Sequence, residues 1–376
     1  MHNERKLFSW KSPLHLVKRS NLPWWQALLY RLLAVFVGLL LMCFVLWLMV
    51  KASPVAVFAN LFSGSFGSER RIWFTFRKMA LLLCAGLALI PAFRMRFWNL
   101  GGNGQILMGD LAAIMCMYFG GQAGWPNWAI ILLMIPSSLF AGALWGVIPA
   151  IFKAFFNTNE SLFTLMMNYI ASGIVTIFLG AVVTSGSGTL PIQEAGHLPV
   201  IGNNDYLLVL LLAVAILAFV YVYLRFSKHG YELEVVGDSE NTAKYIGINV
   251  RWTIIRTMAL SGALCGVIGM LLAGAMDFTI TADSAQNMGF TAIMVAWLAK
   301  FDPFAMLGTS FLVAFLDNGM ASGVQRAFGI TNNSIGQIVI GIVYFCIIAV
   351  EFFINYRIQF QHLVPDVEVH TEKGKK

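Results

Sequence analysis

The chain has 376 residues, of which 59% are hydrophobic and only 11% are charged, and its mean hydropathy is +0.75. Soluble domains carry about one-quarter charged residues, so this composition excludes a soluble globular protein. The formal net charge is +7, but the basic residues gather at the ends of apolar runs. That placement is a signal of membrane topology and argues against nucleic-acid binding.

Apolar runs of membrane-crossing length recur along the sequence. A helix needs about 20 residues to cross a hydrocarbon core of about 30 Å, and these runs lack the alternating polarity of barrel strands. The sequence therefore predicts an all-α integral membrane protein with about ten transmembrane helices. The predicted spans lie near residues 28–50, 72–93, 104–120, 128–152, 161–183, 206–225, 253–276, 288–300, 303–319 and 334–356. The eighth is short and only Phe301-Asp302-Pro303 separates it from the ninth, so these two form either a tight hairpin or partly re-entrant helices.

Lysine and arginine predict the orientation of the chain. They are concentrated before the first span, around the polar insert near residues 225–256, and in the last residues, which predicts that both termini and the insert are cytoplasmic. Residues 1–27 are interpreted as a cytoplasmic or interfacial segment that is not cleaved, residues 28–356 as the transmembrane domain, and residues 357–376 as a cytoplasmic tail.

Neither metal nor nucleotide chemistry is predicted. The five cysteines lie inside apolar runs, without a CxxC pair or a histidine at ligand spacing, which argues against disulfides and zinc. The sequence contains no GxxxxGK[ST] loop, so any ATP that drives this protein must bind to another chain. Small-residue pairs at Gly142/Gly146 and Gly262/Gly266 predict close helix packing, within the subunit or between two subunits.

A Gly-rich and amide-rich stretch separates the second apolar run from the third. Its sequence is RMRFWNLGGNGQ, at residues 94–105. Glycine permits non-helical backbone angles, and amides supply hydrogen-bonding groups without the desolvation cost of a charge. Interrupted helices of this kind line substrate paths in transporters, although ordinary capping of a cytoplasmic turn would also explain the amides. The predicted path residues are Asn99, Asn103, Gln105, Asp110 and Asn168, with the neighbouring aromatics Phe97, Trp98 and Tyr169.

Four collinear motifs between about residues 72 and 350 resemble the permeases of ABC importers for branched-chain amino acids, ribose and nucleosides. They are RFWNLGGNGQILMGDLAA at 96–113, NESLFTLMMNYI at 159–170, GYEL with YIGINV at 230–250, and GFTAI at 289–293 followed by Asp302-Pro303. The resemblance is narrower still to the nucleoside and simple-sugar branch. Family members carry Glu where this chain has Asn103 and a small residue where it has Asp110.

The resemblance implies that the polar insert, about residues 232–247, is a coupling helix that docks on an ATPase subunit. The residue types agree, because its charged side chains supply a solvated face while Ala243 and Gly247 offer a small-residue stripe for close contact. The predicted coupling residues are Glu232, Glu234, Asp238, Ala243, Lys244 and Gly247.

Two polar stretches, 99–110 and 281–290, each precede a short apolar run. In the predicted topology they face opposite sides, so spans two to five and seven to ten would form an inverted repeat. Asp110 and Asp317 lie within apolar segments, where an ionisable residue is by default a functional candidate. Asp283 near a span end is interpreted as merely solvated.

The sequence thus predicts a non-catalytic, multi-pass permease subunit of a bacterial ABC importer in the plasma membrane, carrying a nucleoside or similar small polar solute. The implied partners are ATP-binding subunits that hold ATP and Mg²⁺, a second permease subunit, either identical or different, and an extracytoplasmic binding protein. The alternatives are a simple-sugar or other small-metabolite ABC permease and a proton-coupled secondary carrier using Asp110 or Asp317. A lipid-modifying enzyme is disfavoured because no paired-carboxylate, HExxH or Ser/His cluster is present.

Overall fold

A computed structural model describes residues 14–18, 23–183, 186–202, 204–331 and 333–360 of the chain. These residues belong to two compact units, one formed by residues 1–54 with 337–376 and the other by residues 55–336. The predicted N-terminal and C-terminal tails lie largely outside the described residues.

The first unit joins the two ends of the sequence. Its elements are β1 (Leu14–Lys18), α1 (Trp24–Val50), most of α14 (Asn333–Asn355) and β2 (Tyr356–Phe360). The strands pair antiparallel, with Leu14 opposite Phe360 and Lys18 opposite Tyr356. Arg31 of α1 and Glu351 of α14 form an ion pair at 2.6 Å. The pair links two helices whose residues are 320 positions apart in the sequence.

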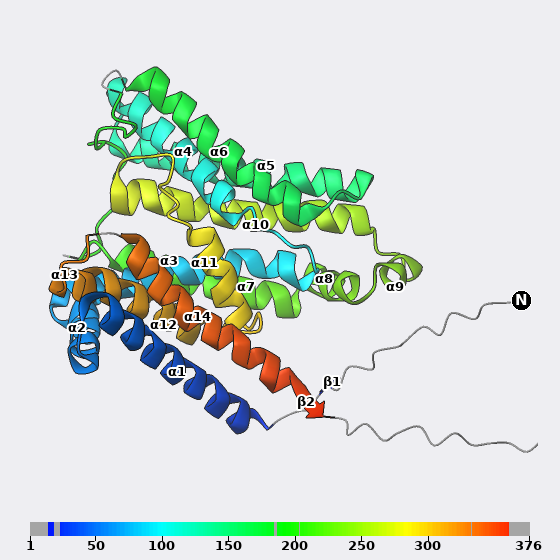
Figure 1. The fold of residues 1–376 in the computed structure, drawn as a ribbon. Helices are drawn as coiled ribbons and strands as arrows, with labels where there is room; N and C mark the ends of the chain where they lie inside the picture. Colours follow the sequence, from blue (N-terminus) through cyan, green and yellow to red (C-terminus); the bar gives the residue numbers. More distant parts are fainter. Residues whose placement is uncertain (1–13, 19–22, 184–185, 203, 332, 361–376) are drawn as a thin grey trace, which may run out of the picture. The chain divides into compact units, whose positions relative to one another are not determined.

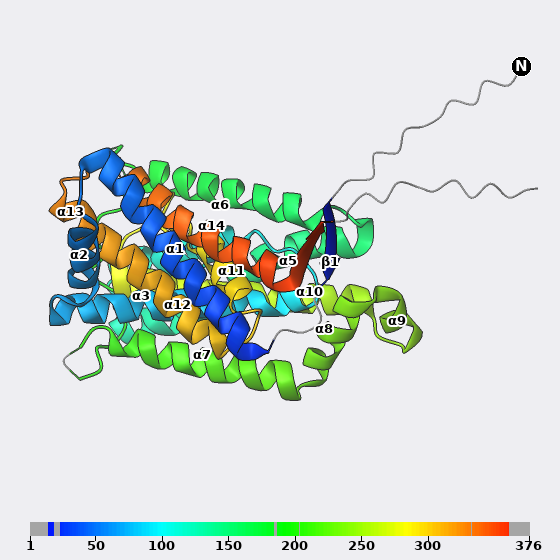
Figure 2. The ribbon, with the colours of Figure 1, turned by 60° about the horizontal axis from the view of Figure 1, so that its bottom comes forward.

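The second unit contains the remaining helices (Figure 1). In chain order they are α2 (Pro54–Phe66), α3 (Glu69–Arg94), α4 (Gly102–Gln122), α5 (Asn127–Phe156), α6 (Glu160–Val182), α7 (Leu207–Phe226), α8 (Lys228–Asp238), α9 (Glu240–Tyr245), α10 (Val250–Leu272), η1 (Ala273–Asp277), α11 (Met288–Leu298), α12 (Ala305–Gly319), η2 (Met320–Val324) and α13 (Gln325–Ala327). Helices α8 and α9 lie at one end of this unit, and α2 and α13 at the opposite end (Figure 1 and Figure 2).

Within the described residues, six helices are long and apolar enough to cross a membrane. They are Leu29–Val50, Glu69–Arg94, Asn127–Phe156, Glu160–Val182, Leu207–Phe226 and Val250–Asp277. Helices also form at the other four predicted spans, as α4, α11, α12 and α14. The all-α prediction is confirmed, whereas the number of ten crossings and the orientation of the termini stay predictions.

The structure differs from the predicted spans in two places. Residues 54–66, which lie outside the predicted spans, form the apolar helix α2. The ninth span does not end at residue 319, because α12 continues through the wide turn η2 into α13 at Ala327. Helix α11 has 11 residues and is about 16 Å long at 1.5 Å per residue, which is too short to cross alone.

Helices α3 and α10 form the centre of the second unit. The apolar windows of these two helices are 78% and 72% buried, against 28% for those of α5, α6 and α7, which leaves the latter three with faces for lipid or other chains. Glycines allow the close packing: a Cβ at Gly142 of α5 would lie 2.2 Å from the carbonyl oxygen of Gly262 in α10. The predicted small-residue contact is therefore confirmed within the subunit.

The polar insert contains two short helices rather than one. Side-chain oxygens cap three successive helices here: Ser227 accepts from the Gly230 N–H, Ser239 from the Thr242 N–H, and Asn249 from the Trp252 N–H. Each cap satisfies an N–H that lacks a helical partner. Because Ser239 has an extended backbone, the insert breaks there into α8 and α9.

Candidate functional site

Two helices begin at the same place in the second unit. Helix α4 begins at Gly102 and α11 at Met288, and the Asn103 Oδ1 accepts a hydrogen bond from the Gly289 N–H at 2.8 Å. The backbones approach so closely that a Cβ at Gly289 would lie 2.3 Å from the Asn103 nitrogen. The two polar stretches, predicted to face opposite sides, thus meet at their helix starts.

Side chains of helix α6 also bind the start of α4. Asn168 accepts from the Gly104 N–H at 2.8 Å and donates through Nδ2 to the Leu100 carbonyl at 2.9 Å. One helical turn away, the Thr164 Oγ1 accepts from the Leu100 N–H at 3.1 Å. Side chains of α6 therefore satisfy backbone groups that the break in the chain leaves without helical partners.

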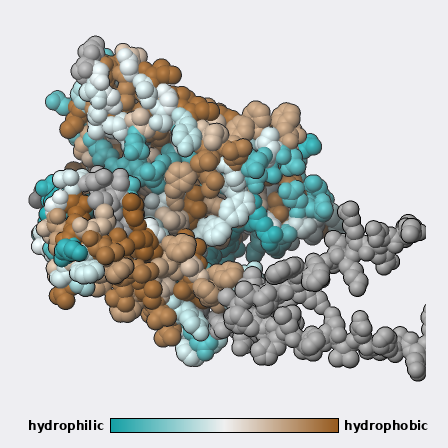
Figure 3. Space-filling model, in the orientation of Figure 1, coloured by the Kyte–Doolittle hydropathy of each residue, from teal (hydrophilic) through white to brown (hydrophobic). Residues whose placement is uncertain are grey.

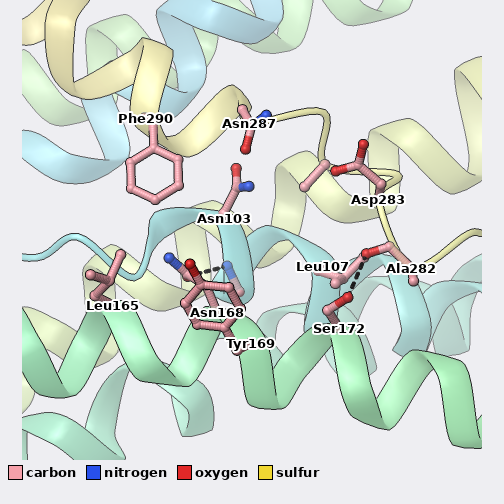
Figure 4. Close-up of a pocket in the computed structure, with 12 residues that line it drawn as sticks. Asn103, Leu107, Leu165, Asn168, Tyr169, Ser172, Ala282, Asp283, Asn287 and Phe290 are labelled. Carbon is pink, nitrogen blue, oxygen red and sulfur yellow. Dashed lines mark hydrogen bonds between the residues drawn. The ribbon is translucent and has the colours of Figure 1, made fainter.

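A pocket of about 180 Å³ opens where these segments meet (Figure 4). Figure 4 shows the residues of α6 along one side, Asn103 and Leu107 of α4 in the middle, and Asp283, Asn287 and Phe290 on the other side. The pocket is lined by Asn103, Gly104, Leu107, Leu165, Asn168, Tyr169, Ser172, Ala282, Asp283, Ala285, Asn287 and Phe290.

The lining is amide-rich and aromatic. Tyr169 is 69% exposed, so its ring is available to a ligand. Asn287 has φ +58°, a left-handed conformation that Asn tolerates better than most residues, and no described residue bonds to its side-chain amide. Asp283 is the single charged side chain among the lining residues.

The loop that carries Asp283 continues from residues 274–280, which are bonded to the loop of residues 190–198. The N–H groups of Leu190, Gln193 and Leu198 donate to the carbonyls of Ile280, Phe278 and Gly274, at 3.2, 2.8 and 2.9 Å. The His197 ring stacks on Phe278 with centroids 4.1 Å apart. Ser172 of α6 donates to the Ala282 carbonyl at 3.0 Å, which fastens the loop beside the pocket.

Three of the predicted path residues line this pocket: Asn103, Asn168 and Tyr169. Asn99 and Gln105 do not. Both are buried and hydrogen-bonded to each other, with Asn99 Nδ2 donating to Gln105 Oε1 at 3.2 Å. Their amides brace the turn before α4, because a buried amide needs partners and each supplies the other.

Phe97, Trp98 and Asp110 also lie outside the pocket. Phe97 is buried and borders a different hollow, which is also lined by residues of α8, and Trp98 packs on Trp297 with ring centroids 5.3 Å apart. Asp110 is 1% exposed, and no described residue hydrogen-bonds to either carboxylate oxygen. Asp317, the other acid considered for proton coupling, forms an ion pair with Lys78.

Two predictions for the insert are wrong. Glu232 is not on a solvated face, because it is buried and paired with Arg256 of α10. Ala243 is fully buried, so it offers no stripe to another surface. The exposed predicted residues are Glu234, Asp238, Lys244 and Gly247.

Different residues of the insert reach the surface. Tyr245, the last residue of α9, is 92% exposed, and Ile246 directly after it is 50% exposed. The surface around this end of the unit is largely hydrophilic (Figure 3). Sequence reasoning missed this pair, together with Ser172, Asp283, Asn287 and Phe290 of the pocket. The polar stretch 281–290 indicated this region. No pattern in the sequence, however, distinguishes the residues that line the pocket from those that only form the turn.

Side chains fasten α8 to the long helices. His229 lies between Tyr223 of α7, whose hydroxyl meets Nδ1, and Thr257 of α10, whose Oγ1 lies 3.2 Å from Nε2. Partial burial, aided by the nearby Arg256, lowers the pKa of His229 below its ordinary value of 6.5. With the Glu232–Arg256 pair, these contacts make α8 an extension of α7 and α10 rather than a loose loop.

Comparison with known proteins agrees with this architecture. Residues 71–348 match the family described as the branched-chain amino acid transport system / permease component. The guanosine ABC transporter permease protein NupP of Bacillus subtilis is 32% identical over 72% of this chain and 79% of its own length. The nucleoside ABC transporter permease protein NupB of Lactococcus lactis is 27% identical, covering 93% and 98%. The glucose ABC transporter permease protein TsgB13 of Haloferax volcanii is 26% identical, covering 92% and 93%.

The family match covers most of the sequence, including the helix break, α6, the insert and the loop around Asp283. Together with the six membrane-length helices, it identifies a multi-pass membrane protein. This chain belongs to the family of permease components of branched-chain amino acid transport systems.

Proposed function

We propose that this chain is the permease subunit of an ABC importer and that the pocket beside Asn103 lies on its path for a nucleoside or a similar small polar solute. The observation that carries the proposal is the meeting of two helix starts, α4 and α11, at a pocket clamped by α6. Interrupted helices expose polar backbone only where it lines a cavity or is buried in protein, and transporters place substrate there.

The chemistry of the lining fits a nucleoside. Amides of Asn103 and Asn287 can donate to and accept from the edge of a base. Tyr169 and Phe290 offer ring faces for stacking, which contributes about 1–3 kcal/mol per base in proteins that bind single strands. The similarity to a guanosine permease and a nucleoside permease supports the same class of solute.

ATP would be hydrolysed by separate subunits that hold ATP and Mg²⁺ and dock at the end formed by α8 and α9, which is cytoplasmic in the predicted topology. The exposed Tyr245 and Ile246 supply an apolar contact there. A push on α9 would pass through α8 and the Glu232–Arg256 pair to α10, which runs through η1 to the loop of the pocket. Alternating access would follow from this movement.

The remaining partners follow from the proposed importer. A second permease subunit, identical or different, would complete the path, and an extracytoplasmic binding protein would deliver the solute in the plasma membrane. This chain would catalyse no covalent step and bind no cofactor.

Reconstitution tests the proposal directly. The chain is co-expressed with its ATPase, second permease and binding protein, placed in proteoliposomes, and supplied with labelled guanosine, with and without ATP inside. ATP-dependent accumulation supports the proposal, and its loss with Tyr245→Arg together with loss of the co-purified ATPase locates the coupling surface. Uptake driven by a pH gradient without ATP would instead identify a proton-coupled carrier.

A simple sugar is the second candidate solute, favoured by the glucose relative that covers almost the whole chain. Labelled glucose in the same proteoliposomes distinguishes the two solutes, because the binding protein can be exchanged while the permease is kept. Accumulation of glucose without guanosine would overturn the nucleoside assignment and leave the ABC importer standing.

A further inference from the structure

We propose that Asp283 determines specificity in this pocket by accepting hydrogen bonds from the vicinal hydroxyls of a ribose. The inference rests on the proposed function and adds a residue and a recognised group to it. It begins with the position of Asp283 as the single charge in an otherwise amide-rich and apolar lining.

The backbone around Asp283 is fixed, whereas its carboxylate is available. The Asp283 N–H donates to the Thr281 Oγ1 at 3.3 Å, and its carbonyl accepts from the Gln286 N–H at 2.9 Å. No described residue forms an ion pair or hydrogen bond with the carboxylate, and the residue is exposed. The turn thus fixes the position of the Asp283 backbone beside the pocket and leaves both carboxylate oxygens free to accept hydrogen bonds from a ligand.

The helix starts beside the pocket do not form an anion site. Their N–H groups would ordinarily favour a negative ligand, but Asn103 already accepts from Gly289, and Asn168 accepts from Gly104. No lysine or arginine lines the pocket. A phosphate would therefore meet the Asp283 carboxylate with no cation to balance either charge.

The two ends of the pocket suit the two ends of a nucleoside. In Figure 4, Phe290 and Tyr169 lie toward one end and Asp283 with Ser172 toward the other. Ring faces at the first end suit a base, and a carboxylate with two oxygens at the second suits a pair of neighbouring hydroxyls. Hydrogen bonds from a hydroxyl to a carboxylate are roughly twice as strong as neutral ones.

The test compares uptake of guanosine with uptake of 2′,3′-dideoxyguanosine, which lacks both hydroxyls. The proteoliposomes contain the complete transporter with wild-type chain, Asp283→Ala or Asp283→Asn, and the same binding protein. For each permease the guanosine rate is divided by the dideoxyguanosine rate. Because the binding protein is unchanged, its own preference cancels when these ratios are compared between permeases.

We expect Asp283→Ala to lower this ratio by about tenfold or more, since removing a hydrogen bond to a charged group has an effect of that size. Asp283→Asn keeps one acceptor oxygen and should lie between wild type and Asp283→Ala. Glu194→Gln is the matched control, because it removes an exposed carboxylate from the neighbouring loop of residues 190–198, which does not line the pocket.

An unchanged ratio in Asp283→Ala would overturn the inference while leaving the proposed function intact. A wild-type transporter that accumulates neither nucleoside would overturn the proposed function and this inference with it. If Asp283→Ala fails to assemble with the ATPase, the ratio for Asp283→Asn decides, and equality with wild type there counts against the assignment.

Discussion

Replacing Gly266 by alanine should destabilise the second unit by forcing two helices apart. A Cβ at Gly266 would lie 2.1 Å from the Ser138 carbonyl oxygen of α5, whereas ordinary contacts begin at 3.4 Å. Helix α5 would have to move by about 1.3 Å, the difference between these distances. Rotation of a side chain cannot relieve this clash, because the Ser138 oxygen belongs to the backbone. Overpacking of this kind costs about 1–3 kcal/mol.

The matched control is Gly180→Ala in α6, where a Cβ would have nothing within 4 Å. The same chemical change there should stabilise slightly, by about 0.5–1 kcal/mol, through the better helix propensity of alanine. The assay is thermal unfolding of the detergent-solubilised chain followed by tryptophan fluorescence, with gel filtration before and after heating. Equal unfolding midpoints for the two variants would refute the argument from backbone contact.

Three further outcomes follow from the described contacts. Asn168→Ala removes the two hydrogen bonds from Asn168 to the start of α4 and should lower guanosine uptake at least tenfold while leaving the co-purified ATPase in place, as measured in proteoliposomes and by pull-down. Tyr245→Ala should reduce the amount of ATPase that co-purifies, whereas Glu194→Gln, an exposed change outside α8 and α9, should not. His229 has a lowered pKa in the folded chain, so the unfolded chain binds a proton first as the pH falls below about 6.5, and stability should decrease there. His229→Gln should flatten that decrease in thermal unfolding scans at pH 5 to 8, and a wild-type midpoint that rises on acidification would contradict the sign.

Hydropathy was sufficient to locate the long helices in the sequence. Runs of about 20 apolar residues have one solution in a membrane, so the helices at Glu69–Arg94 and Leu207–Phe226 lie where the sequence predicts them. Helix α2 was missed because its 13 residues fall below that length. The break of the insert at Ser239 depends on capping, which a hydropathy window does not detect.

The candidate site was only partly predictable, because its members come from three separate segments of the chain. Asn103 and Asn168 were found through the amide-rich motifs, but the same motifs contain Asn99, whose amide turns inward to Gln105. Glu232 was expected to be solvated because its partner, Arg256, lies a further two dozen residues along the chain. A charged side chain can be buried only where a counterion lies nearby, and a single sequence does not reveal which distant residue is the counterion.

The paired segment beside the pocket has a mechanical consequence. Three N–H groups of residues 190–198 donate to carbonyls of residues 274–280, which lead directly into the loop that carries Asp283, so the two segments are expected to move together. We expect a rotation of residues 190–198 to be passed to the loop that carries Asp283. The consecutive left-handed residues Gln286 and Asn287, at φ +43° and +58°, are where such a rotation would be absorbed. A nanobody that binds residues 190–198 is therefore expected to inhibit transport without occupying the pocket.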